Sequence, residues 1–211
     1  MGQIWKRIDR KDNCGNTDEI GNIYHNVFNL LNKATLKNVI IGPNSNKYVN
    51  CPHGECTLEN VWWEDACNNA ITLKSDFPIP KSYFYIKGGG VRNARGNIIQ
   101  HNSASKVYIE NFYVENSEQL YSSCENCRRG SYQGNFGYQG KRFAYMTNVT
   151  ALNVETLAGY NSNFLDIVTL QNIRFTGKHV CKIIEGRDDG EKARVLGYKC
   201  ESTSISKCVC N

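Results

Sequence analysis

Along the chain, apolar and polar residues alternate over short runs that end in glycine, asparagine or serine, a pattern that predicts β-strands. One phrase recurs in these runs: an apolar residue, a variable residue, an asparagine and a second apolar residue, as in LKNV, LENV and LQNI. Its copies place asparagines at Asn38, Asn60, Asn111, Asn148 and Asn172. A phrase that returns in this way indicates a repeated structural unit.

The spacings between these asparagines are 22, 51, 37 and 24 residues. The longest equals about two turns of 25, with YFYIKGGG at 83–90 as a weakly marked strand between them, and 37 fits one turn plus a polar insertion at 124–141. Each phrase is followed by a second short β-rich segment, which is typical of a coiled parallel sheet. We therefore predict an all-β fold, a right-handed single-stranded parallel β-helix of about seven or eight rungs.

The segment 18–34, DEIGNIYHNVFNLLNKA, is open to two interpretations. Its apolar residues Ile20, Ile23, Val27, Leu30 and Leu31 fit the stripe of an amphipathic helix. The same run also fits one more rung of the β-helix, and the repeats that follow it favour this second reading.

The composition indicates one folded domain over residues 1–211, with 40% hydrophobic residues and a formal net charge of +5. The basic residues are scattered along the chain, which argues against a nucleic-acid partner, and no apolar run reaches the length of a membrane span. The first residues, MGQIWKRIDRKDNC, lack the apolar core of a signal peptide, so we expect any leader to be absent from this sequence. We expect a monomer.

Ten cysteines are spread over the chain, and an even number of this kind is typical of disulfides in a secreted, extracellular protein. The alternative is zinc, because Cys124-x-x-Cys127 has the spacing of a ligand pair. A tetrahedral site needs a second such pair or a pair of histidines, and the four histidines form none. We therefore predict a fold stapled by disulfides. The sequon at Asn148 agrees with secretion.

Several longer phrases resemble the family 3 pectate lyases, which are secreted single-domain parallel β-helix enzymes. The phrases are ATLKNVIIG at 34–42, CPHGECTLENVWWED at 51–65, KGGGVRNARGNIIQHN at 87–102, IENFYVENSEQLYSSCENC at 109–127 and AGYNSNFLD at 158–166. The resemblance covers roughly residues 4–185, with a Cys-rich C-terminal tail at 186–211. Members of the family usually carry more chain before the segment WKRID, so residues 1–17 correspond to a shortened N-terminal cap.

The resemblance implies calcium-dependent β-elimination on polygalacturonate, in which a lysine or arginine removes the C5 proton and other cations hold uronate groups. The base is most often assigned to a lysine at the position of Asn97. The family's Lys-Leu-x-Arg phrase is replaced by a run from Gln119 to Ser122. These three catalytic positions are therefore substituted, and Arg95 is the candidate replacement.

The implied Ca²⁺ site is also changed. Asp65 is kept with Glu64 beside it, but the family's second acidic pair is replaced by Asn68 and Asn69. Calcium affinity falls with the number of carboxylates, so we expect weak binding of Ca²⁺ at these four positions.

Four basic residues are candidates for binding an acidic polysaccharide: Lys47, which replaces a family acid, Arg92, Lys74 and Arg128. For Arg92 and Lys74, as for Arg95, a solvated surface position is the alternative. His101 belongs to the family's Gln-His-Asn phrase, and we interpret it as structural.

Two functions follow from these positions. The first is a secreted pectate lyase directed at plant cell-wall pectate, with weak or no activity because most site charges are substituted. The second is a catalytically silent β-helix that binds pectin or a host protein. A hydrolase on the same architecture ranks last, since Asp65 has no facing second acid.

Overall fold

The computed structural model describes residues 4–9, 26–31, 33–43, 45, 49–74, 82–127, 140–187, 192–200 and 204–211. Within these ranges the regular structure is β-strand, apart from one short 3-10 helix, η2 (Ser162–Phe164). No helix in the described ranges is long and apolar enough to cross a membrane. The strands are β1 (Lys6–Ile8), β2 (Phe28–Asn29), β3 (Ala34–Ile41), β4 (Val49–Cys51), β5 (Cys56–Trp63), β6 (Ile71–Leu73), β7 (Tyr83–Arg92), β8 (Asn97–His101), β9 (Lys106–Glu110), β10 (Tyr113–Ser123), β11 (Phe143–Asn161), β12 (Ile167–Glu185), β13 (Arg194–Lys199) and β14 (Ser204–Cys210).

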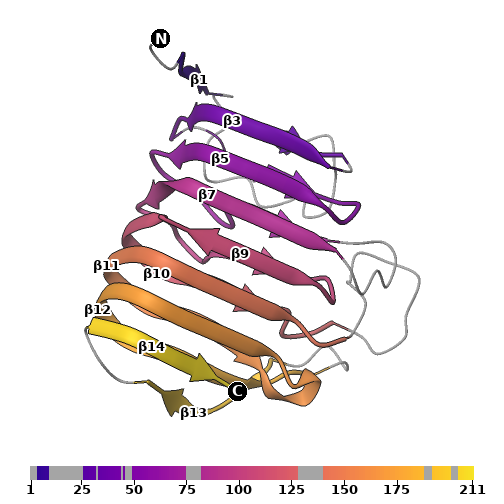
Figure 1. The fold of residues 1–211 in the computed structure, drawn as a ribbon, viewed down its shortest axis with the longest axis vertical. Helices are drawn as coiled ribbons and strands as arrows, with labels where there is room; N and C mark the ends of the chain where they lie inside the picture. The colour runs from indigo at the N-terminus through magenta and orange to yellow at the C-terminus, as the bar shows by residue number, and fades with distance from the viewer. Residues whose placement is uncertain are drawn as a thin grey trace.

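The strands coil around one axis and stack in parallel, with the two chain ends at opposite ends of the stack (Figure 1). On the side that we name face 1, the first parts of β3, β5 and β7 are followed by β9 and by the starts of β11 and β12. Face 2 holds β1, the second halves of β3, β5 and β7, the start of β10 and the middle parts of β11 and β12. Face 3 holds β2, β4, β6, β8 and the ends of β10, β11 and β12.

This parallel β-solenoid confirms the predicted fold class, with about six turns where seven or eight rungs were expected. In the segment 18–34, the described end contains β2, which pairs in parallel with β4, as the second reading predicted. Residues 18–25 and 32 lie outside the described residues. The rung predicted at 83–90 is β7, which pairs with β5 and β9.

The recurring asparagines form the bend between face 1 and face 2. All five have a positive φ of about 55°, between 53° and 55°, which asparagine tolerates better than most residues. Their amides bond from turn to turn: Asn60 donates to Asn38, Asn148 to Asn111 and Asn172 to Asn148. A glycan on Asn148 would remove one of these donors, because its Nδ2 bonds Asn111.

In β7 the bend position is occupied by Gly88, with φ +64°. A Cβ at this position would lie 2.5 Å from Oδ1 of Asn60 in the preceding turn. Glycine therefore meets both the positive φ and the close approach of the neighbouring side chain, and this is why the phrase is weak in this rung.

Inside the coil, apolar side chains of similar size stack on one another from turn to turn. On face 1 one inward row contains Leu58, Ile86, Ile109, Met146 and Leu170, each at most 1% exposed. Such a row buries a continuous apolar core along the axis, so each turn is stabilised by the turns before and after it.

At the C-terminal end, β13 and β14 pair antiparallel with β12 and cover the edge of its last turn (Figure 1). Disulfides join Cys181 to Cys210 and Cys200 to Cys208 in this tail, and two more join Cys51 to Cys56 and Cys124 to Cys127. No described cysteine is free. The disulfide prediction is confirmed, and zinc binding by Cys124 and Cys127 is excluded because these sulfurs are bonded to each other.

Candidate functional site on face 3

Two rows of residues cross face 3 in register from turn to turn. The first row pairs Asn97 with Gln119, then Thr156 and His179. The second row runs through Asn50, Thr72, Gln100, Ser122, Gly159 and Lys182. The substituted catalytic positions predicted from the sequence therefore share one face, since Asn97 and Gln119 are neighbours and Ser122 lies beside Gln100.

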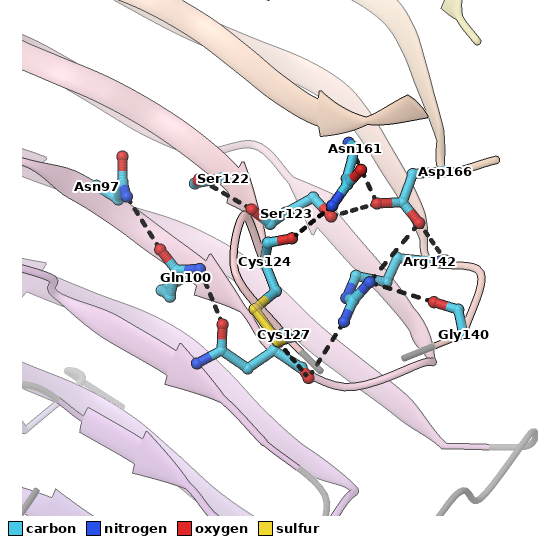
Figure 2. Close-up of a disulfide and its surroundings, with 11 residues drawn as sticks. Asn97, Gln100, Ser122, Ser123, Cys124, Cys127, Gly140, Arg142, Asn161 and Asp166 are labelled. Atoms are coloured by element: carbon cyan, nitrogen blue, oxygen red, sulfur yellow. Dashed lines mark hydrogen bonds and ion pairs between the residues drawn. A yellow bond between two sulfur atoms is a disulfide. The ribbon is translucent and has the colours of Figure 1, made fainter. Parts of the chain in front are cut away.

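The amides on this face are fixed by hydrogen bonds. Asn97 Nδ2 donates to Gln100 Oε1 at 2.9 Å (Figure 2). Gln100 Nε2 in turn donates to Asn102 Oδ1 at 2.8 Å. Gln119 Nε2 donates to the carbonyl of Tyr121 at 2.9 Å. Primary amides neither take up nor release protons near neutral pH, so Asn97 and Gln119 supply hydrogen bonds but no base.

Ser122 is fully buried, and its hydroxyl donates to the carbonyl of Ser123 at 3.1 Å. It therefore offers face 3 neither a charge nor an accessible hydroxyl. Two further buried polar atoms in the second row, Asn50 Oδ1 and Thr72 Oγ1, have no hydrogen-bond partner. The sequence analysis did not single out these two residues. They come to notice only because Asn50 on β4 pairs with Thr72 on β6 in the second row.

The predicted metal positions lie in the turn that leads from β5 toward face 3. Asp65 is partly buried and its Oδ1 has no hydrogen-bond partner, whereas Glu64 binds Arg7 through contacts of 2.6 and 3.3 Å. Asn68 is exposed and its Oδ1 lies 3.5 Å from where a Cβ on Gly96 would be. Asn68 is thus close to the turn that precedes Asn97 on the next rung.

This donor set does not fit a calcium ion. Ca²⁺ takes about six to eight oxygen ligands and gains affinity from several carboxylates. Here Asp65 offers one unpaired carboxylate oxygen, Glu64 is engaged by Arg7, and Asn68 and Asn69 are neutral. Among the described residues, the one group of three or more metal-ligand side chains close together is Cys181, Cys200 and Cys210, whose sulfurs form disulfides.

The predicted substrate-binding residues are scattered. Arg92 ends β7 on face 2 and pairs with Glu115 at 3.3 Å, so it does not join Asn97. Lys74 directly follows β6, and its backbone N–H donates to the carbonyl of Cys51 at 2.9 Å. Arg95, the candidate replacement base, is exposed in the turn before β8. Lys47 and Arg128 lie outside the described residues.

Comparison with known proteins agrees with this fold. The family model described as "Pectate lyase" matches residues 2–191. The chain belongs to the pectate lyase family. A probable pectate lyase F of Aspergillus terreus is 38% identical over 194 residues, covering 92% of this chain and 78% of the relative.

Solved pectate lyases show the same architecture. A pectate lyase of Pectobacterium carotovorum superposes with a TM-score of 0.69 at 25% identity, over 84% of this chain and 56% of that one. A pectate lyase of Erwinia chrysanthemi in complex with tetragalacturonic acid superposes with a TM-score of 0.58 at 25% identity, over 83% of this chain and 65% of that one. The chain thus spans somewhat more than half of the length of these two structures.

In this pectate lyase family chain, a buried polar cluster closes the end of face 3 (Figure 2). Asp166 accepts hydrogen bonds from the Ser123 hydroxyl and from the backbone N–H of Arg142 at 2.8 Å, and the Arg142 guanidinium lies 3.9 Å from the same carboxylate. Burial raises the pKa of Asp166, and the positive charge of Arg142 opposes that shift. The phrase AGYNSNFLD contains Asp166, but nothing local in the sequence marks Arg142 as its partner.

His101 belongs to the same interior. It is fully buried, its Nδ1 lies 3.0 Å from the Tyr121 hydroxyl, and its Nε2 lies 2.6 Å from the Ser105 hydroxyl. Burial, and to a lesser degree the charge of Arg142, keeps the pKa of His101 well below its ordinary value. These contacts confirm the structural interpretation of His101.

The stability of the protein is expected to fall on acidification because of His101. The folded state keeps the ring neutral, whereas the unfolded chain takes up a proton near pH 6.5, so the stabilisation is present above this pH and is lost as the pH falls toward the lowered pKa. We expect a loss of about 1 kcal/mol for each pH unit below about 6. Urea unfolding between pH 7.5 and 5 measures it. His101→Gln should remove the contribution of His101 to the slope of the unfolding free energy against pH. The control His53→Gln, at an exposed residue, should leave that slope unchanged. Equal slopes in the two variants would contradict the role given to His101.

Proposed function

We propose that this chain binds polygalacturonate along face 3 and cleaves it weakly or not at all. The observation that carries the proposal is the neutral row formed by Asn97 and Gln119, which are in register on adjacent turns where the resemblance puts the base and a substrate-binding cation. The Erwinia chrysanthemi structure with tetragalacturonic acid supports the choice of ligand, because the relative's fold covers most of this chain.

The chemistry of β-elimination explains why these substitutions matter. The C5 proton beside a uronate carboxylate is weakly acidic, so its removal requires a positioned base and a cation that stabilises the negative charge of the intermediate. The amide of Asn97 is not basic, and its Nδ2 already donates to Gln100. The same face retains amides and hydroxyls, which are suited to hydrogen bonds with sugar hydroxyls.

The proposal includes an extracellular location and weak affinity for Ca²⁺. The disulfides between Cys51 and Cys56 and between Cys124 and Cys127 persist in an oxidising compartment, which supports secretion. Weak affinity for Ca²⁺ is supported by the single unpaired carboxylate oxygen of Asp65.

An assay on polygalacturonate tests the proposal. The wild-type protein is expected to form unsaturated uronide about 10²–10⁴-fold more slowly than an active relative assayed in parallel, because a general base contributes a factor of this size. Adding Ca²⁺ or a chelator is expected to change the rate little, while calorimetry should detect binding of tetragalacturonate. Chelator-sensitive turnover at a rate within tenfold of that of the active relative would contradict the proposal that catalysis is weak or lost. Failure to bind tetragalacturonate would contradict the proposal that polygalacturonate is the ligand.

A further inference from the structure

Lys182 on β12 places its ammonium on face 3. Its Nζ donates to Oε1 of Gln119 at 2.7 Å, although the two residues are 63 positions apart in the chain. In the register of face 3, Gln119 lies two turns before His179, and Lys182 is in the same turn as His179. The lysine side chain therefore extends backward across the intervening turn to reach the amide.

Gly159 makes this contact sterically possible. It lies between Ser122 and Lys182 in the second row of face 3. A Cβ at Gly159 would lie 2.7 Å from Nε2 of Gln119 and 3.4 Å from Cε of Lys182. The missing side chain leaves the path along which Lys182 approaches Gln119.

The charge of Lys182 is not neutralised within the described part of the chain. No described carboxylate lies within ion-pair distance of it, and its partner Gln119 is neutral. Lys178, on the same strand, differs in this respect, because its Nζ lies 3.0 Å from a carboxylate oxygen of Glu155. A half-buried cation that is held by an amide and has no counter-ion among the described residues favours binding of an anion.

We propose that Lys182 and Gln119 form a carboxylate-binding subsite on face 3, which rests on the proposed function. The ammonium has three donors, and Gln119 uses one of them, so two remain for the carboxylate of a bound uronate. Gln119 is itself held by its bond to the Tyr121 carbonyl, which directs Oε1 toward the lysine. Gln119 is a positioning residue, and Lys182 provides the charge.

An aromatic side chain borders this subsite. Tyr198 on β13 is opposite Lys182 in the antiparallel pair, and its ring stacks on His179 with a centroid distance of 3.6 Å. Tyr198 is 41% exposed, so part of its ring is open to a ligand. A cation beside a partly exposed ring fits an acidic sugar, which offers a carboxylate to the cation and a face of C–H groups to the ring.

Binding of tetragalacturonate, measured by calorimetry on the whole chain, tests the subsite. Lys182→Met is expected to raise the Kd about tenfold and to make the Kd less dependent on salt, because one charge-assisted contact is lost. Lys182→Arg should keep most of the affinity. The matched control Lys178→Met should change the Kd less than twofold, since it removes a lysine from the same strand that already pairs with Glu155. A neutral galactose tetramer controls for contacts that do not involve charge.

The outcomes separate the subsite from the proposed function. If the wild type and the folded Lys182→Met variant bind tetragalacturonate equally, the subsite is wrong and the function stands. If the wild type does not bind tetragalacturonate, both the carboxylate subsite and the proposed binding of polygalacturonate are wrong. A loss of affinity that is equal for the neutral tetramer would also overturn a carboxylate subsite. Thermal unfolding of each variant confirms that the fold is kept.

Discussion

Replacing Asp166 with alanine is expected to lower the free energy of unfolding by about 3–5 kcal/mol. The carboxylate accepts hydrogen bonds from the Ser123 hydroxyl and from two backbone N–H groups, those of Arg142 and Asn161. It is also the acidic partner of the Arg142 guanidinium, which is fully buried. Removing it takes this carboxylate away from the buried Arg142 guanidinium and leaves three hydrogen-bond donors without this acceptor. Removing one partner of a buried ion pair is strongly destabilising.

Urea unfolding with the disulfides intact measures this effect, and two variants serve as comparisons. Asp166→Asn keeps an oxygen acceptor and should cost less than Asp166→Ala. Lys178→Ala breaks an ion pair on the surface with Glu155, so a change of less than about 1 kcal/mol is expected. A loss for Asp166→Ala as small as that of Lys178→Ala would show that the cluster contributes little to stability.

Much of the fold could be predicted from the asparagine phrase, because the asparagine of each copy adopts the positive φ that the bend between face 1 and face 2 requires. Asn38 and Asn60 have positive φ values and bond each other, so their spacing in the sequence is the length of one turn. A second ladder, Asn93, Asn116 and Asn153, has the same φ and the same type of contact, but no recurring apolar phrase surrounds it. It therefore became visible only in the structure.

The candidate site could be predicted in part. The alignment of phrases located Asn97 and Gln119, and the register confirms that they are neighbours on face 3. It could not separate Arg92 from them, because the turn after β7 takes the chain to face 3 and leaves Arg92 on face 2, where it pairs with Glu115. Lys182 escaped prediction because its contact with Gln119 depends on two turns of coiling and on the absence of a side chain at Gly159.

Restoring charge at three positions is expected to raise the rate of β-elimination by at least about 100-fold over the wild type. The variant combines Asn97→Lys, which restores a base, with Asn68→Glu and Asn69→Asp, which add carboxylates beside Asp65. Asn68 Oδ1 lies 3.5 Å from where a Cβ on Gly96 would be, so the added acids and the added base would be on neighbouring turns. Asp65 already has an unpaired carboxylate oxygen, which a calcium ion could use once more carboxylates surround it.

The matched control carries the same two acids with Asn97→Met, which is similar in length to lysine but has no base. Its rate should stay at the wild-type level, and a chelator should abolish the gain of the lysine variant, as measured by the absorbance of unsaturated uronide. Ser122 is left unchanged because it is fully buried, and an arginine there would overpack the wall of face 3. If a folded lysine variant shows no turnover at millimolar Ca²⁺, the base does not belong at position 97.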